Sequence, residues 1–366
     1  YLFLVWAVFR YALQISNFPD DGIYIQENTS NVEIGTIGKP NIIINNGRTS
    51  TSGDGIYAFN TDSLSIQGNL IGTNLNNTQN TSNADDGIHI TNSSNINIGT
   101  IFGNLIVKNG DDGIVIIESN MVNIFSNSIG GNQALSNNDI GNNGNGITLI
   151  GGSNINIGAS LNDYKNNILN NKENGLLVQD LEGINIINNT ISGNTKDGIY
   201  AFNTQQINID DNIIGTNEDG TASYANEDDG IEINSCFNVI IGNIANIIAS
   251  NNDIGINVLN ASDNVSILHN YIGTSDMFGT TTFPNGNAGI NLANSSNIAI
   301  GNYENIVANA IVNNLNNGIY ANNINTLNII NNLISNNTLD GVFINNSLSI
   351  NILANKIGTN HIGSAT

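Results

Sequence analysis

The octapeptide DGIYAFNT occupies residues 54–61 and returns unchanged at residues 197–204. The match extends further, because residues 54–99 align with residues 197–242 without a gap and are identical at 24 of 46 positions. The identical positions are mostly glycine, isoleucine, asparagine and aspartate, and the variable positions lie between them. We interpret the two copies as an internal duplication in which the shared residues hold a backbone shape.

A shorter repeat lies inside the long one and is marked by a glycine that precedes alternating apolar residues. These glycines recur every 23 to 34 residues, at Gly22, Gly55, Gly87, Gly113, Gly146, Gly175, Gly198, Gly230, Gly255, Gly289, Gly318 and Gly341. Periods of about 20–50 residues are typical of solenoids, in which each unit buries its apolar face by stacking on its neighbours.

The period inside each short unit indicates strands. Segments such as DGIHI at 86–90 and NINIG at 95–99 alternate apolar and polar residues, which is the period of a half-buried strand. Isoleucine is β-branched and favours strands over helices. We predict about twelve coils of three short strands, paired in parallel about 4.8 Å apart, with longer loops such as residues 216–227 on alternate coils.

These repeated segments resemble a known family. The patterns Asp-Gly-Ile-x-Ile, Asn-Ile-x-Ile-Gly and Asn-x-Ile-Gly-Thr-Asn, which cover residues 20–366, look like the pectate-lyase-like superfamily. More narrowly, they look like bacterial secreted and surface proteins built from such repeats. The resemblance implies an all-β, right-handed parallel β-helix. It implies little about function, because this superfamily includes lyases, hydrolases, epimerases, tailspikes and adhesins.

Composition narrows the class of partner. Thirty acidic residues against eight basic ones give a net charge of −22, which argues against nucleic acid as a partner and against binding to anionic membranes. The abundant asparagines are predicted to stack in ladders at the turns, where their amides bond one coil to the next. Cys236 is the single cysteine, so an internal disulfide is impossible and the residue is expected to pack as a small apolar side chain.

The two ends differ from the repeats between them. Residues 1–19 are predicted to be an N-terminal cap or the remnant of a signal peptide, and residues 20–366 the β-helix domain. The apolar run 2–9 is too short to span a bilayer. Because the last residues begin a long loop and stop within it, we expect a fragment truncated at its C-terminal end. The expected location is secreted or on the cell surface, with no membrane span.

Two pairs of aromatic residues are candidates for glycan binding. In Gly-Ile-x-Ile-x the isoleucines point inward, so the x positions face outward. Tyr57 with Phe59, and Tyr200 with Phe202, occupy these outward positions five coils apart. Exposed aromatic rings are platforms for the C–H faces of sugars. The alternative is that the four side chains only pack under the loops that follow.

The residues before the repeat glycines are candidates for chemistry. Aspartates stand there on consecutive coils, among them Asp86 and Asp112, and carboxylates about 5 Å apart raise one another's pKa or bind a cation. His89 lies on the strand that follows Asp86, and Tyr57 occupies the equivalent position one repeat earlier. Asp86, His89, Asp112 and Tyr57 are therefore the candidate catalytic residues of a polysaccharide lyase, glycoside hydrolase or epimerase, with Lys108 as the nearby cation.

Several observations argue against catalysis. The Gly-His-Gly and Arg-x-Lys segments of polygalacturonases and the Asp-Pro-His-Glu signature of mannuronan epimerases have no counterpart here. In the second copy His89 is replaced by Glu232. The structural alternative is that each aspartate before a glycine closes a turn through its own backbone, as in Asx-turns.

The sequence therefore predicts a secreted or cell-surface β-helix that binds an extracellular polysaccharide or cell-surface glycan, or that serves as a stalk. The alternative is a polysaccharide-active enzyme that works in a groove on the first sheet. No metal ligands and no cofactor are predicted. Calcium is the one cofactor candidate, because stacked aspartates attract a cation that prefers oxygen ligands.

Overall fold

The computed structural model describes residues 13–36, 38–48, 53–74, 81–131, 140–160, 164–303 and 309–359. The chain divides into two compact units, residues 1–177 and 178–366. Within the described residues the regular elements are β-strands, and no α-helix is present. None of the described segments forms a helix with the length and apolar character that a membrane crossing requires.

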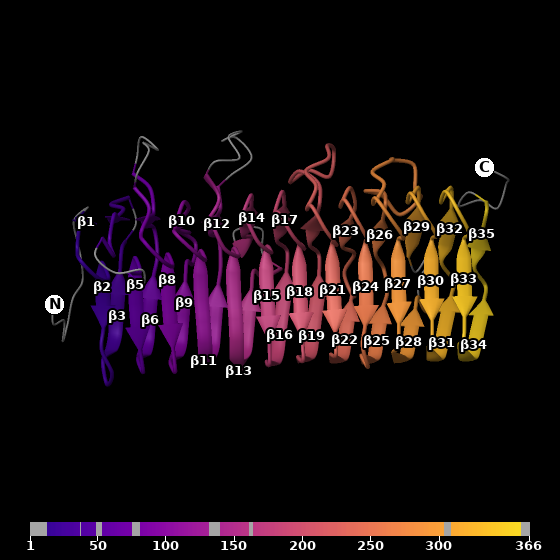
Figure 1. Cartoon of the computed structure of the whole chain (residues 1–366), viewed down its shortest axis with the longest axis horizontal. Coiled ribbons are helices and arrows are strands. Elements are labelled where there is room, and N and C mark those ends of the chain that lie inside the picture. Colours follow the sequence, from indigo (N-terminus) through magenta and orange to yellow (C-terminus); the bar gives the residue numbers. More distant parts are fainter. Residues whose placement is uncertain are drawn as a thin grey trace. The chain divides into compact units, whose positions relative to one another are not determined.

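The first unit is built from coils of short strands that pair in parallel with the equivalent strands of the next coil (Figure 1). Its strands are β1 (Gln14–Ser16), β2 (Ile23–Ile25), β3 (Ser30–Ile34), β4 (Ile42–Ile44), β5 (Ile56–Phe59), β6 (Asp62–Ile66), β7 (Leu70–Ile71), β8 (Ile88–Thr91), β9 (Ser94–Ile98), β10 (Leu105–Ile106), β11 (Ile114–Ile124), β12 (Ser128–Ile129), β13 (Ile147–Ile157) and β14 (Asn167–Leu169). The first strands of successive coils pair in the order β2-β5-β8-β11-β13. The third strands pair in the order β1-β4-β7-β10-β12-β14.

The second unit repeats this arrangement. β15 (Leu176–Gln179) contains the point of division, and the strands after it are β16 (Glu182–Ile187), β17 (Thr190–Ser192), β18 (Ile199–Phe202), β19 (Gln205–Asp210), β20 (Ile213–Ile214), β21 (Ile231–Asn234), β22 (Phe237–Ile241), β23 (Ile247–Ile248), β24 (Ile256–Leu259), β25 (Asp263–Ile267), β26 (Tyr271–Ile272), β27 (Ile290–Ala293), β28 (Ser296–Ile300), β29 (Ala310–Val312), β30 (Ile319–Asn322), β31 (Asn325–Ile330), β32 (Leu333–Ser335), β33 (Val342–Asn345), β34 (Leu348–Leu353) and β35 (Lys356–Ile357). Its first strands pair in parallel in the order β18-β21-β24-β27-β30-β33. The predicted parallel β-helix is confirmed in both units.

The register stacks identical residues on one another in the core. Ile56 pairs with Ile88, and Ile88 pairs with Ile114. All three side chains are fully buried, whereas the residues between them on β5 and β8 are only half-buried. This alternation confirms the two-residue period. Burying an isoleucine side chain stabilises the fold by about 1.5–3 kcal/mol, so the columns of isoleucine supply the main driving force.

Asparagine ladders run through the turns, as predicted. The amide of Asn83 donates to Asn109 Oδ1 at 2.9 Å, and Asn83 Oδ1 accepts from the amide of Asn46 at 2.9 Å. In the second unit the amide of Asn226 donates to Asn251 Oδ1 at 2.9 Å. These side chains are buried, and each satisfies the polar atoms of its neighbours. Asparagine is therefore required at these positions for its donor and its acceptor together.

A second use of asparagine lies at the turn after each first strand. Asn60, Asn92 and Glu118 occupy equivalent positions there with φ of 52°, 51° and 49°. Among non-glycine residues, asparagine adopts this left-handed conformation most readily. The requirement for positive φ explains why the sequence places asparagine after so many of the Gly-Ile-x-Ile segments.

Some details differ from the expectation. β11 and β13 each join the first and second strands of a coil into one strand of 11 residues. Val115, Thr148 and Asn257, which the alternation places outward, are buried. Thr148 and Asn257 are buried because their side chains bond the aspartates beside them. Cys236 is buried and free, as expected.

The N-terminal segment is described only in part. Residues 14–16 of the predicted cap form β1, which pairs in parallel with β4. Residues 1–12, which include the whole apolar run 2–9, lie outside the described residues, as do the last residues 360–366.

Candidate functional site

The aspartates before the repeat glycines form a ladder between coils. Asp54 Oδ1 accepts a hydrogen bond from the backbone N–H of Asp86 at 3.0 Å, and Asp86 Oδ1 accepts one from the N–H of Asp112 at 2.9 Å. The prediction that each aspartate bonds its own turn is therefore wrong. Because the equivalent residue lies one coil away, the bond joins coils, fixes the carboxylate and leaves its second oxygen, Oδ2, for another partner.

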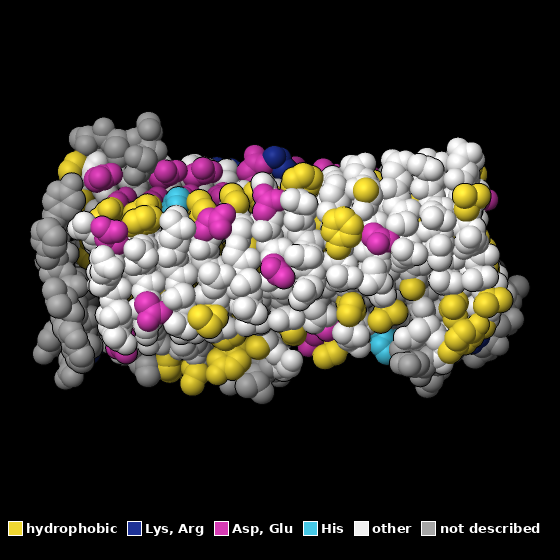
Figure 2. All heavy atoms as spheres, turned by 90° about the horizontal axis from the view of Figure 1, so that it is seen from below, with side chains coloured by type: hydrophobic (Ala, Val, Ile, Leu, Met, Phe, Trp, Pro, Cys, Tyr) yellow, Lys and Arg dark blue, Asp and Glu magenta, His cyan; other side chains and the backbone are white. Residues whose placement is uncertain are grey.

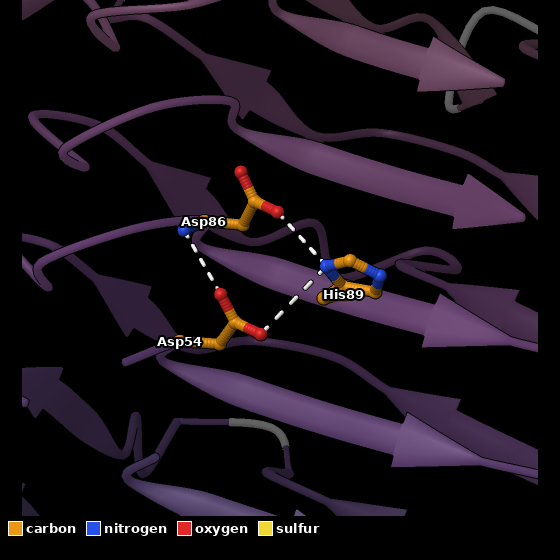
Figure 3. A group of neighbouring side chains, drawn as sticks. All are labelled: Asp54, Asp86 and His89. Atoms are coloured by element: carbon orange, nitrogen blue, oxygen red, sulfur yellow. Dashed lines mark hydrogen bonds and ion pairs between the residues drawn. The ribbon is translucent and has the colours of Figure 1, made fainter. Parts of the chain in front are cut away.

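His89 is that partner for two of the aspartates. Its Nδ1 lies 3.0 Å from Asp86 Oδ2 and 3.7 Å from Asp54 Oδ2 (Figure 3). The imidazole stands on β8 at an outward position, with 23% of its side chain exposed, and the other ring nitrogen points away from the carboxylates. Asp54 and Asp86 are buried. The three side chains thus form a cluster in which the two carboxylates are buried and the imidazole is partly exposed.

Aromatic side chains continue the row beside this cluster. The rings of Tyr24 and Tyr57 stack with centroids 5.4 Å apart and an angle of 12° between their planes. The Tyr57 and His89 rings lie 5.2 Å apart and are tilted by 44°. Tyr57 therefore has a ring on each side along the coil stack, which leaves its edge and hydroxyl, rather than its faces, turned to solvent. This arrangement differs from the open sugar platform that the sequence suggested.

The other candidate catalytic residues are placed elsewhere. The carboxylate of Asp112 is held by the backbone N–H of Asn145 and the hydroxyl of Thr148, so it does not join the histidine cluster. The side chain of Lys108 makes no hydrogen bond or ion pair with the described residues. The structure brings together Asp86, His89 and Tyr57 and adds Asp54. Asp54 could have been found from the sequence, because it precedes a repeat glycine as Asp86 and Asp112 do.

Burial controls the protonation of these carboxyls. Desolvation, together with the nearby charges of Asp86 and Asp21, raises the pKa of Asp54 to about 9. Desolvation also raises the pKa of Asp112 to about 6, although the hydrogen bonds from Thr148 and Asn145 oppose that effect. At neutral pH Asp54 is therefore mostly protonated, and the column carries less negative charge than its composition implies.

The second copy has the same ladder but different side chains around it. Asp197 Oδ1 accepts a hydrogen bond from the N–H of Asp229 at 2.9 Å. Asp229 Oδ2 accepts one from the amide of Asn257 at 2.7 Å. Desolvation raises the pKa of Asp197 to about 8 and that of Asp229 to about 7. Glu232 occupies the position that His89 has in the first copy.

The predicted glycan-binding aromatics differ in their exposure. Tyr57, Phe59 and Tyr200 are half-buried, and Phe202 is 36% exposed. Tyr200 pairs in register with Glu232, so no aromatic ring stands opposite it on the next coil. Figure 2 shows acidic side chains gathered in a row beside hydrophobic ones and a histidine, over the N-terminal coils.

A polar groove lies at the corner where the first strands of the first unit end. Its volume is about 460 Å³, and all of its lining side chains are Asn, Ser, Thr, Asp or Glu, from four successive coils. The side-chain amides of Asn28, Asn60 and Asn92 line it and form no hydrogen bond with the described residues. Asp62 and Glu118 add carboxylates. Sequence reasoning missed this groove, because its concavity depends on how the turns of several coils align.

Three groups of side chains have the donor atoms that a metal ion needs. Among the described residues these groups are Asp54, Asp86 and His89; Asp85, Asp86 and Asp111; and Asp197, Asp228 and Asp229. The first alone combines carboxylates with an imidazole.

Comparison with known proteins gives a limited result. No protein-family model matches the chain, and no curated protein matches it. The A-module of the mannuronan C-5 epimerase AlgE6 from Azotobacter vinelandii is 12% identical, over 94% of this chain and 86% of that chain, with a TM-score of 0.39. The periplasmic alginate epimerase AlgG is 12% identical, over 82% of this chain and 76% of that chain, with a TM-score of 0.37.

A surface adhesin is similar to the same degree. PfbA of Streptococcus pneumoniae is 12% identical, over 92% of this chain and 83% of that chain, with a TM-score of 0.32. Identities and TM-scores as low as these carry no argument about function. The parallel β-helix rests on the strand pairings described above.

Proposed function

We propose that the protein binds a neutral polysaccharide in the polar groove of its first unit. The observation that carries this proposal is the lining of the groove, in which amides, hydroxyls and carboxylates converge without an apolar side chain. Sugar hydroxyls both donate and accept hydrogen bonds, and this mixture of groups pairs with both roles. The amides of Asn60 and Asn92 are uncommitted within the described residues, so a ligand need not break an existing bond.

The repeat geometry suits a polymer rather than a small molecule. The groove crosses four successive coils, and coils repeat about every 4.8 Å. A linear chain laid along the groove therefore meets a similar set of side chains at each step. Several weak contacts on one chain reinforce one another through effective concentration.

One aromatic residue, Phe59, precedes a residue that lines the groove and could extend the contact. Phe59 directly precedes Asn60 and is half-buried at an outward position. It offers an apolar surface to the C–H groups of a sugar ring, worth on the order of 1 kcal/mol.

Charge selects the class of glycan. The net charge of −22 repels polyuronates and other polyanions at long range, whereas a neutral polysaccharide is not repelled. A polysaccharide of this kind is met outside the cell, in agreement with the predicted secreted or cell-surface location.

The test is binding to immobilised neutral polysaccharides and to polyuronates. Replacing both Asn60 and Asn92 with glycine removes the amides but keeps the positive φ, which glycine adopts freely. We expect this double variant to bind a neutral polysaccharide at least tenfold more weakly than the unmodified protein. Asn203→Gly, at the equivalent turn of the second unit with φ of 48°, is the matched control and is expected to bind normally. Binding to no glycan, or full binding by the double variant, would overturn the proposal.

A second candidate function is catalysis on a polysaccharide. The observation that favours it is the pairing of Asp86 Oδ2 with His89 Nδ1 at 3.0 Å, which leaves the other imidazole nitrogen directed outward. A carboxylate that holds an imidazole in this way prepares it for general acid–base chemistry. Release of reducing ends or unsaturated products, lost in Asp86→Asn and His89→Ala, would establish the enzyme. We expect no such release from polyuronates.

A further inference from the structure

Three potential ligand atoms converge at one place in the first unit. Asp54 Oδ2, Asp86 Oδ2 and His89 Nδ1 come from two neighbouring coils and lie within 4.8 Å of one another (Figure 3). The ladder explains the convergence. Oδ1 of both aspartates is held by a backbone N–H of the next coil, and this bond turns each Oδ2 toward the imidazole.

One of the three atoms, Asp54 Oδ2, has only a long contact with the imidazole, which points to a ligand. The Asp54 side chain is only 6% exposed, yet its Oδ2 accepts no hydrogen bond from the described residues. The nearest donor is His89 Nδ1 at 3.7 Å, beyond hydrogen-bond distance. A bound cation would give this oxygen a partner.

The donor set selects the kind of cation. Calcium prefers six to eight oxygen ligands, and an imidazole nitrogen does not suit it. Manganese and zinc accept imidazole and carboxylate together. We propose that Asp54, Asp86 and His89 bind a divalent first-row transition metal ion, such as Mn²⁺ or Zn²⁺, through Oδ2, Oδ2 and Nδ1.

The second unit lacks this site although its ladder is the same. The amide of Asn257 occupies Asp229 Oδ2, and Glu232 replaces the histidine and accepts hydrogen bonds from Asn234 and Asn257. The candidate group of the second unit, Asp197, Asp228 and Asp229, offers carboxylates alone, so the second unit is an internal control for the histidine. The proposal is also independent of glycan binding, because the groove lies at the other end of the first strands and metal binding is measured without a glycan.

The experiment is a calorimetric titration of the chelator-treated full chain with Mn²⁺, Zn²⁺ and Ca²⁺. We expect about one equivalent of Mn²⁺ or Zn²⁺ per chain and weaker binding of Ca²⁺. Asp54→Asn and His89→Ala should each weaken Mn²⁺ binding at least tenfold. In Asp54→Asn the ladder is retained, because the asparagine Oδ1 still accepts the Asp86 N–H. Asp197→Asn is the matched control and should bind Mn²⁺ normally.

A spectroscopic measurement keeps the test decisive if a variant folds poorly. In the unmodified protein, Zn²⁺ should shift the imidazole NMR signals of His89 and leave those of His269, a half-buried histidine of the second unit, in place. No binding of Mn²⁺ or Zn²⁺ at millimolar concentration would overturn the proposal. So would unchanged affinity in Asp54→Asn, or Zn²⁺ shifts that spare His89.

Discussion

The two copies of the octapeptide fold alike but surround the same aspartate with different side chains. In the first copy Asp86 Oδ2 meets the imidazole of His89 at 3.0 Å. In the second copy the equivalent oxygen of Asp229 accepts the amide of Asn257 at 2.7 Å. Val115 holds the position in the first copy that Asn257 holds in the second. The ladder therefore belongs to the coil, whereas the partner of Oδ2 varies between copies.

The largest expected effect tests what the copies share. A Cβ on Gly87 would lie 2.6 Å from the carbonyl oxygen of Gly113, and a Cβ on Gly230 would lie 2.7 Å from that of Gly255. Backbone atoms cannot move aside, so Gly87→Ala and Gly230→Ala should each destabilise their own unit by about 3 kcal/mol. Hydrogen exchange read by mass spectrometry separates the two units. Near-normal protection in either variant would show that the copies do not need the glycine equally.

The next effect separates the copies by pH. The pKa of Asp54 rises to about 9 and that of Asp197 to about 8, mainly through burial. The folded state thus binds the proton more tightly than the unfolded state, whose pKa is about 3.9. Stability therefore falls as the pH rises from about 4 toward these values.

Replacing the carboxyl with an amide should remove this decline. Asn145 already makes the same ladder bond, since its Oδ1 accepts the N–H of Asn174 at 3.0 Å. We expect Asp54→Asn to stabilise the protein at pH 9 by about 1.4 kcal/mol or more, which is one pKa unit. Asp197→Asn should give a smaller gain that is complete near pH 8. Urea unfolding between pH 5 and pH 9 measures both, and curves parallel to that of the unmodified protein would contradict the expectation.

The features that repeat in every coil, the core isoleucines and the asparagine ladders, were predicted from the sequence. Ile88 and Asn83 recur at fixed places in the coil, and their roles follow from period and chemistry alone. The stack of Tyr24, Tyr57 and His89 was also readable, because the three residues occupy the same outward position of successive repeats. The spacing between coils stacks Tyr24 on Tyr57 and places His89 against the other side of Tyr57, which covers the surface that was expected to bind sugars.

Other features depend on side-chain conformation and could not be predicted. Asp86 and Asp112 have the same place in the repeat, yet one meets His89 and the other meets Thr148. Which side chain reaches Oδ2 depends on the rotamers of residues on two coils. Val115 is likewise buried at an outward position. Strand alternation predicts the direction in which a side chain points, but not whether neighbouring side chains cover it.

A transplant sharpens the comparison at the metal cluster. Glu232→His combined with Asn257→Val gives the second copy the side chains of the first around Asp197 and Asp229. With the amide gone, Asp229 Oδ2 is available and a second site should form. We expect a second equivalent of Mn²⁺ to bind, within about tenfold of the affinity of the first. Calorimetry measures it, with Asn257→Val alone as the control. A transplant that binds no second ion would show that these two positions do not account for the difference.

The smallest effect concerns the aromatic rows. Tyr57 stacks on Tyr24 at 5.4 Å, whereas Tyr200 stands opposite Glu232. Aromatic pairs of this geometry contribute about 0.5–1.5 kcal/mol beyond their buried area. Tyr57→Ala should therefore cost about 1 kcal/mol more than Tyr200→Ala, although both residues occupy the same place in the octapeptide.

A double-mutant cycle isolates that difference. Alanine at Tyr24, at Tyr57 and at both positions gives a coupling energy from which the separate burial of each ring cancels. We expect the cycle to yield about 1 kcal/mol. A cycle of Tyr200 with Glu232, its neighbour on the following coil, should yield less, because a carboxyl beside a ring gains no stacking. Chemical unfolding supplies the four free energies of each cycle. Equal couplings in the two units would mean that the stacked rings add nothing beyond contact. The repeated Tyr-Ala-Phe segment would then have the same role in both copies. The copies would still differ in the side chain that contacts the aspartate, which is His89 for Asp86 and Asn257 for Asp229.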